Sequence, residues 1–148
     1  MRVLLDTNIL ISAFLGSQKE IRLVRAVAFG AGKTELVVPW EIVSELRAVL
    51  QEKFRAKPGV AEFVRFFEGL LADPRRGWRL PVGGDEAILA AARRLEADLI
   101  VTGDRALLHR KQFADSPIVR TADALRILAS SPGDQEHIYR GLNRLGRR

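Results

Sequence analysis

Short apolar runs alternate along this chain with longer stretches whose apolar residues have helical spacing. Residues 2–5 form the first run, which ends at once in Asp6, and the later runs are separated from it by helical segments. This alternation predicts an α/β fold, a three-layer sandwich whose central, mostly parallel sheet is flanked by helices. The connections between parallel strands are expected to be right-handed crossovers.

The periodicity also predicts where the elements lie. Strands are expected at residues 2–5, 35–38, 98–101 and 118–119, with a further short strand at 78–80. Helices are expected at 8–15, 20–29, 40–54, 60–71 and 87–95, as a short helix from 106, and at 122–128 with Thr121 as its cap. The length of 148 residues allows one core. We expect a single domain over residues 1–129, followed by a loosely ordered basic tail or short helix at 130–148.

The composition excludes several classes of site and location. The chain has no cysteine and two histidines, so disulfides, zinc ribbons and thiol nucleophiles are excluded, and a metal would need oxygen ligands. Oxygen ligands favour Mg²⁺ or Mn²⁺. No apolar run approaches the roughly 18–20 residues that span a bilayer. The first apolar run stops at Asp6, unlike a signal peptide, so a cytoplasmic protein without a membrane partner is expected.

The formal net charge of +6 is unevenly distributed. Residues 75–148 hold 14 Lys and Arg against nine Asp and Glu, whereas residues 1–74 hold ten against nine. Such a basic half fits either a polyanionic partner or a solvated surface, and charge alone leaves both open. If the partner is RNA, Arg75, Arg76 and Arg79 are candidates for binding its backbone.

Two acids follow predicted buried strands. Asp6 follows the run at 2–5, and Asp104 follows Thr102 and Gly103 after the run at 98–101. Ligands of open α/β sheets bind at the carboxyl ends of the strands, so the two acids would lie side by side if their strands are neighbours. Taken alone, each acid is explained by capping of the helix that follows it, but two such acids in one sheet make capping a weaker explanation for both.

Two further acids lie on predicted helices. Asp85 falls at the start of the helix at 87–95, where the helix dipole favours an acid, and Glu45 lies at the border of an apolar stripe. Each has an ordinary explanation by itself. Four carboxylates at one pole would repel one another, and a divalent cation would neutralise them, activate water and stabilise charge on a phosphoryl group.

Two other phosphate motifs fit poorly. Gly32-Lys33-Thr34 resembles the end of a P-loop, but Val27 stands where that motif needs a glycine. Asp6-Thr7-Asn8 resembles the start of an aspartyl phosphatase, but Asn8 stands where a second acid is needed.

The order of four motifs resembles the PIN-domain ribonucleases, and most closely the VapC-like toxins of toxin–antitoxin pairs. These motifs are Leu5-Asp6-Thr7-Asn8, Ser44-Glu45-Leu46, Asp85 before residues 88–92, and residues 100–104 ending in Asp104. The resemblance covers roughly residues 1–129 and implies an endoribonuclease that cleaves RNA with metal-activated water.

By position, the resemblance implies Asp6, Glu45, Asp85 and Asp104 as catalytic acids. Asp6, Asp85 and Asp104 would bind Mg²⁺ or Mn²⁺, with Thr7, Asn8 and Thr102 in support. It also implies a homodimer and a cognate antitoxin. The alternatives are a non-catalytic RNA-binding module, a metal-dependent phosphatase and a deoxyribonuclease.

Overall fold

The computed structural model describes residues 1–30, 33–72 and 84–130 of the chain. Their five strands form one sheet in the order β2-β1-β3-β5-β4, in which only the β4–β5 pair is antiparallel. The strands are β1 (Arg2–Leu5), β2 (Glu35–Leu36), β3 (Leu99–Val101), β4 (Gln112–Phe113) and β5 (Ser116–Val119). This confirms the predicted α/β fold with a mostly parallel sheet.

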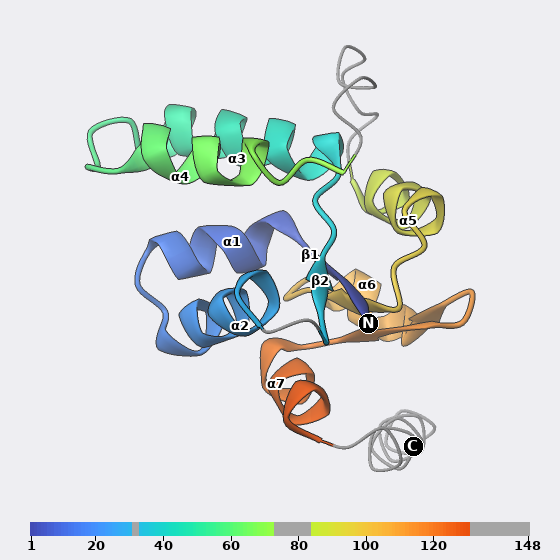
Figure 1. Cartoon of the computed structure of the whole chain (residues 1–148). Coiled ribbons are helices and arrows are strands. Elements are labelled where there is room, and N and C mark those ends of the chain that lie inside the picture. Colours follow the sequence, from blue (N-terminus) through green and yellow to red (C-terminus); the bar gives the residue numbers. More distant parts are fainter. Residues whose placement is uncertain (31–32, 73–83, 131–148) are drawn as a thin grey trace.

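Seven helices of the described residues flank this sheet. They are α1 (Thr7–Phe14), α2 (Gln18–Ala28), α3 (Trp40–Lys53), α4 (Val60–Glu68), α5 (Asp85–Arg94), α6 (Arg105–Arg110) and α7 (Thr121–Ala129). Figure 1 shows α1 and α2 on one side of the sheet and α5 on the other, with the α3–α4 hairpin beyond them. The helices α1 and α2 connect β1 to β2, and α3, α4 and α5 connect β2 to β3 on the other side of β1. Because the two connections run in opposite directions across the sheet, right-handed crossovers place them on opposite faces.

The core lies around the central strands. Val3 and Leu4 of β1 and Leu99 and Ile100 of β3 have no exposed surface, because helices cover both faces of the sheet. Such fully buried parallel strands have continuous apolar sequences instead of alternating ones. On α4, the ring of Phe67 packs edge-on against its neighbours and is also fully buried.

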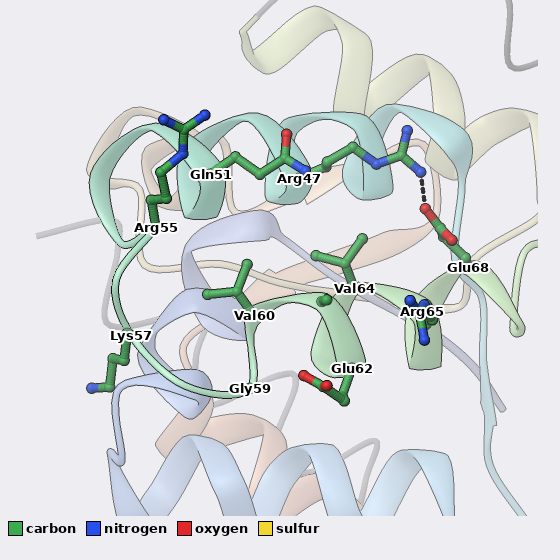
Figure 2. Close-up of a pocket in the computed structure, with 11 residues that line it drawn as sticks. Arg47, Gln51, Arg55, Lys57, Gly59, Val60, Glu62, Val64, Arg65 and Glu68 are labelled. Atoms are coloured by element: carbon green, nitrogen blue, oxygen red, sulfur yellow. Dashed lines mark ion pairs between the residues drawn. The ribbon is translucent and has the colours of Figure 1, made fainter.

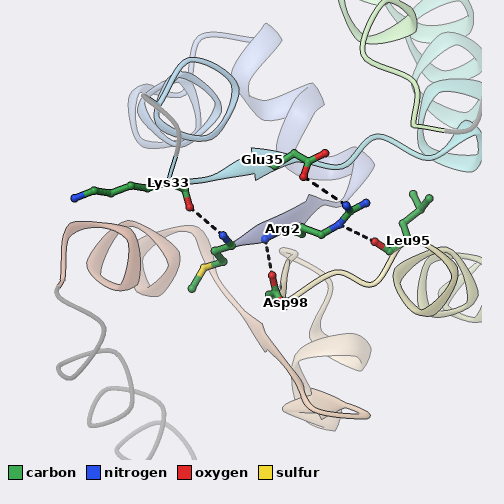
Figure 3. A network of polar contacts seen from close by, with 6 residues as sticks. Arg2, Lys33, Glu35, Leu95 and Asp98 are labelled. Carbon is green, nitrogen blue, oxygen red and sulfur yellow. Dashed lines mark hydrogen bonds and ion pairs between the residues drawn. The ribbon is translucent and has the colours of Figure 1, made fainter.

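Polar contacts fix the amino-terminal end of β1 to the two segments beside it (Figure 3). The Met1 ammonium donates to the Lys33 carbonyl oxygen at 2.9 Å. The Arg2 backbone N–H donates to Asp98 Oδ2 at 2.6 Å, and Arg2 Nε donates to the Leu95 carbonyl oxygen at 3.0 Å. Arg2 Nη1 also lies 3.5 Å from Glu35 Oε2. These contacts hold the register of β1, and with it the position of its carboxyl end.

Several predicted bounds were wrong for identifiable reasons. The helix expected at 60–71 ends at Glu68, since Gly69 is its C-cap, and the strand expected at 35–38 ends at Leu36, with Val38 making a single bridge to Leu71. The short β4 was not predicted because it has no alternating pattern.

Thr121 is not the cap of α7. Arg120 occupies the N-cap position, and the Thr121 hydroxyl lies 3.3 Å from Glu20 Oε1 of α2. The strand predicted at 78–80 and the tail predicted at 130–148 lie, apart from Ser130, outside the described residues.

Candidate active site

The carboxyl ends of β1 and β3 bring two of the predicted acids together. Leu5 pairs with Val101 in the parallel ladder, and the backbone N–H of Asp6 donates to the Val101 carbonyl oxygen at 2.9 Å. The chain leaves both strands at this edge, so Asp6 and Asp104 begin adjacent loops. The condition under which the two acids were expected to be neighbours, adjacent parallel strands, is therefore met.

A cavity of about 180 Å³, which we call the acid pocket, lies at this edge of the sheet. All four carboxylates named from the sequence line it, although they come from four different elements or their ends. Its lining residues are Asp6, Thr7, Asn8, Ile11, Glu45, Gly84, Asp85, Ile88, Asp104 and Leu107. The apolar wall of Ile11, Ile88 and Leu107 was not predicted, because nothing in the helical spacing distinguishes these residues from core residues.

Asp6 is the most buried acid of this pocket, with 7% of its surface exposed. Its Oδ1 accepts the backbone N–H of Thr7 at 2.7 Å. Its Oδ2 accepts the Thr102 hydroxyl at 2.6 Å and the Asn8 side-chain amide at 3.2 Å. Asp6 is therefore the N-cap of α1 as well as a lining residue of the pocket.

Thr102 and Asn8 connect Asp6 to the loop that carries Asp104. The Thr102 hydroxyl, which is completely buried, accepts the backbone N–H of Asp104 at 3.0 Å. Asn8 Oδ1 accepts the backbone N–H of Gly103 at 3.1 Å. Two polar side chains thus fix the carboxylate of one loop relative to the backbone of the other.

The surroundings of Asp6 raise the pKa of its carboxyl group above the ordinary value. Burial raises the pKa of Asp6, hydrogen bonds from Thr102 and Thr7 lower it, and the charges of Glu45 and Asp104 raise it again, with a raised pKa as the result. A buried carboxylate beside two like charges is an arrangement that a bound cation would stabilise.

The other acids retain oxygen atoms that can face the pocket. Asp104 caps α6, where its Oδ1 accepts the backbone N–H groups of Ala106 and Leu107 at 2.7 and 3.1 Å. Glu45 is exposed on α3, and its Oε2 accepts the Thr7 hydroxyl at 3.0 Å. In the described contacts, Asp104 Oδ2 and Glu45 Oε1 accept no hydrogen bond.

Asp85 reaches the pocket through an unusual backbone at Gly84. Gly84 is the N-cap of α5 with φ 94° and ψ −165°, so Asp85 is the first residue of the helix and not its cap. Residues with a Cβ rarely adopt this conformation, which suits glycine alone. The Gly84 torsions therefore fix where Asp85 enters the pocket.

The donor atoms that line the pocket are of the kind that hard divalent cations bind. Four carboxylates, the Asn8 amide and the Thr7 hydroxyl supply oxygen, the ligand atom that Mg²⁺ and Mn²⁺ prefer. Across residues 1–30, 33–72 and 84–130, no three acidic or histidine side chains are already close enough to hold one ion together. A cation would therefore have to draw these carboxylates inward.

The family model of the PIN domain matches residues 2–106. The chain belongs to the PIN-domain family. PIN domains are in general nucleases that use divalent metal ions, so membership indicates a metal-dependent nuclease, a hydrolase. Comparisons with curated proteins and with solved structures found no match.

None of the helices in the described parts of this PIN domain is long and apolar enough to cross a membrane. Arg75, Arg76 and Arg79, named above as RNA-binding candidates, lie outside the described residues.

Proposed function

We propose that this PIN domain is a Mg²⁺- or Mn²⁺-dependent endoribonuclease. The main support is that four carboxylates line one pocket at the carboxyl ends of β1 and β3. The net charge of +6 supports a polyanionic substrate. The choice of RNA over DNA follows from the resemblance to PIN-domain ribonucleases.

In this proposal, Asp6, Asp85 and Asp104 hold the metal ion. Once bound, the ion lowers the pKa of a water molecule and stabilises charge on the scissile phosphate. Glu45 ligates the ion or orients the attacking water, since its Oε1 has no described partner. Thr102 and Asn8 hold the Asp6 carboxylate by the hydrogen bonds described above. Thr7 holds Glu45 in the same way.

A cleavage assay with one matched substitution tests this function. Purified protein is incubated with labelled single-stranded RNA in Mg²⁺ or Mn²⁺ and in EDTA, beside Asp6→Asn and Asp123→Asn. Asp123 is a partly exposed residue of α7 that contacts Arg126 at 3.5 Å and does not line the acid pocket, so it controls for the loss of one carboxylate.

We expect cleavage by the wild type and Asp123→Asn, and a loss of at least roughly a hundredfold with Asp6→Asn or EDTA, the range seen when transition-state charge stabilisation is removed. Cleavage that survives both changes would refute the metal site. Cleavage of DNA but not of RNA would identify a deoxyribonuclease, and RNA binding without cleavage would identify a non-catalytic module.

We also propose that the nuclease acts as the toxin of a toxin–antitoxin pair, as a homodimer that a cognate antitoxin inhibits. This rests on the resemblance to VapC-like toxins. Expression should slow bacterial growth in the wild type but not in Asp6→Asn, and a small partner should co-purify. Normal growth together with the absence of a partner would refute the toxin role and would leave the nuclease proposal unaffected.

A further inference from the structure

A second and larger cavity, of about 620 Å³, lies between α3 and α4 (Figure 2). Its lining comes from α3, from the turn at residues 54–59 and from α4, and it shares no residue with the acid pocket. We call it the α3–α4 groove. Its lining side chains include Arg47, Gln51, Arg55, Lys57, Val60, Glu62, Val64, Arg65 and Glu68.

The groove has an excess of positive charge, since four cationic side chains line it against two carboxylates. One carboxylate, Glu68, forms an ion pair with Arg47. Figure 2 shows the other, Glu62, turned away from α3. For Arg55 and Arg65, the described part of the chain provides no ion pair or side-chain hydrogen bond. These two guanidinium groups are therefore available to an anion.

Two of the four cations, Arg47 and Arg55, form a row with Gln51 along one wall. Arg47 and Gln51 lie one turn apart on α3, and Arg55 lies two residues beyond Lys53, the last residue of that helix. At a rise of about 1.5 Å per residue, α3 alone extends over about 9 Å from Arg47 to Lys53. One strand of a duplex carries about three phosphates over such a length. The row thus suits a polyanion better than a single small anion.

The rest of the lining indicates what kind of polyanion fits. Val60 and Val64 point from α4 toward α3 and provide an apolar floor (Figure 2). No aromatic side chain appears among the described lining residues, so the groove offers neither a base-stacking platform nor an aromatic anchor of the kind that dominates protein interfaces. Three of the four cations are arginines, whose planar guanidinium groups bind phosphate or carboxylate through two hydrogen bonds. The lack of an aromatic anchor, together with the length of the row, therefore favours a sugar–phosphate backbone over an acidic protein.

We propose that the α3–α4 groove binds the backbone of the RNA substrate away from the scissile bond and without regard to base sequence. The proposal rests on the proposed function, from which the identity of the polymer follows. Arg55 and Arg65 make phosphate contacts that position the strand and carry no sequence information.

The groove and the acid pocket lie on different sides of α3. Glu45 of the acid pocket and Arg47 of the groove are two residues apart, which places them about 200° apart around a helix of 3.6 residues per turn. An RNA strand that occupies both places must therefore cross α3, a helix about 10–12 Å wide.

The test measures RNA binding in EDTA, where cleavage plays no part. Fluorescence anisotropy is recorded over a salt series with an unstructured RNA of about 20 nucleotides, which is longer than the roughly 4–16 nucleotides that known single-strand sites occupy. The variant is Arg55→Gln/Arg65→Gln. Its charge-matched control is Lys19→Gln/Arg22→Gln, at two exposed positions of α2 that line neither cavity. Arg55→Lys/Arg65→Lys keeps the charge.

Loss of two phosphate contacts should reduce the slope of log affinity against log salt by about 1.4, at about 0.7 per contact with a single strand. Relative to 1 M salt, this corresponds to an affinity about 25-fold weaker at 0.1 M for this RNA. The control should change little, and the lysine variant, which keeps both charges, should keep the wild-type salt slope. Equal losses in the groove variant and the control would overturn the proposal.

Polyglutamate of matched length serves as the probe for an acidic protein partner. If it binds more tightly than RNA and the groove variant abolishes that binding, the partner is a protein and the proposal is wrong. The two proposals fail separately. A wild type that cleaves RNA while its groove variant binds RNA normally refutes the groove alone, whereas groove-dependent binding without cleavage in Mn²⁺ refutes the nuclease alone.

Discussion

The hydroxyl group of Thr102 supports two parts of the acid pocket, and Thr102→Val removes it while keeping the shape of the side chain. The hydroxyl donates to Asp6 Oδ2 at 2.6 Å and accepts the Asp104 N–H at 3.0 Å, and Thr102 is completely buried. A hydrogen bond to a charged group contributes about 1.5–3 kcal/mol, and a partly buried N–H left without a partner costs about 1 kcal/mol more. We expect the free energy of unfolding to fall by about 3 kcal/mol.

Thr121→Val is the matched control. Thr121 is also buried, at 3% exposed, but its hydroxyl has one described contact, with Glu20 at 3.3 Å, and Thr121 does not line the acid pocket. Because this single contact is long, the substitution should cost about 1.5 kcal/mol, the lower end of the range for a hydrogen bond to a charged group. Both values follow from urea unfolding in EDTA, monitored by circular dichroism, and an unchanged dependence on urea concentration would show that the denatured state is the same.

The same pair of variants separates stability from activity. Because Thr102 holds the Asp6 carboxylate, Thr102→Val should also lower the initial rate of RNA cleavage at saturating Mg²⁺ by about ten- to a hundredfold. Thr121→Val should leave the rate unchanged under conditions where both variants are folded. If Thr102→Val loses no more stability than Thr121→Val and cleaves at the wild-type rate, the role given to this hydroxyl is wrong.

Two further predictions follow from single residues. Gly84→Ala places a Cβ at φ 94° in open space, so its strain of about 1–3 kcal/mol comes from the backbone alone. Gly16→Ala, at φ 96° and also in open space, should lower the stability measured by thermal unfolding by a similar amount. Only Gly84→Ala should slow cleavage, because it moves Asp85, and equal cleavage rates for the two variants would contradict this. Burial raises the pKa of Glu41, but the hydrogen bonds and charge of Arg94, at 2.8 and 2.9 Å, outweigh it and lower the pKa overall. The stabilisation, about 0.5–1 kcal/mol for this partly exposed pair, is therefore present above the unfolded pKa and lost as pH falls through the folded one. Glu41→Gln should flatten that acid limb of urea stability, and an unaltered limb would exclude the pair as its cause.

The sequence predicted the elements of this fold well where a period was long. Helices such as α3 and α5 have several turns of apolar residues on one face, and β1 and β3 are continuous apolar runs. The two-residue β4 has no period to detect, since it forms only because β5 pairs with it in an antiparallel ladder. Lys111, with φ 62°, is the C-cap of α6 and directly precedes β4.

For the candidate site, the sequence supplied the acids but not their neighbours. Asp6 and Asp104 were identifiable because each follows a buried strand, whereas the adjacency of β1 and β3 is a property of the whole sheet. The hydrogen bond from Thr102 to Asp6 joins positions 96 residues apart, and no local pattern encodes such a contact. The α3–α4 groove was missed for the same reason, because Arg47 and Arg65 share a cavity only after two helices have packed.

The placement of β1 between β2 and β3 has a consequence for when the protein becomes able to act. β1 is made first, yet its partner β3 and the acid at position 104 are made about a hundred residues later. Contacts of such long range form slowly and only after the intervening chain exists. During synthesis, the first acid therefore leaves the ribosome well before the strand that completes its pocket. The acid pocket therefore cannot form until β3 and the following loop have emerged from the ribosome.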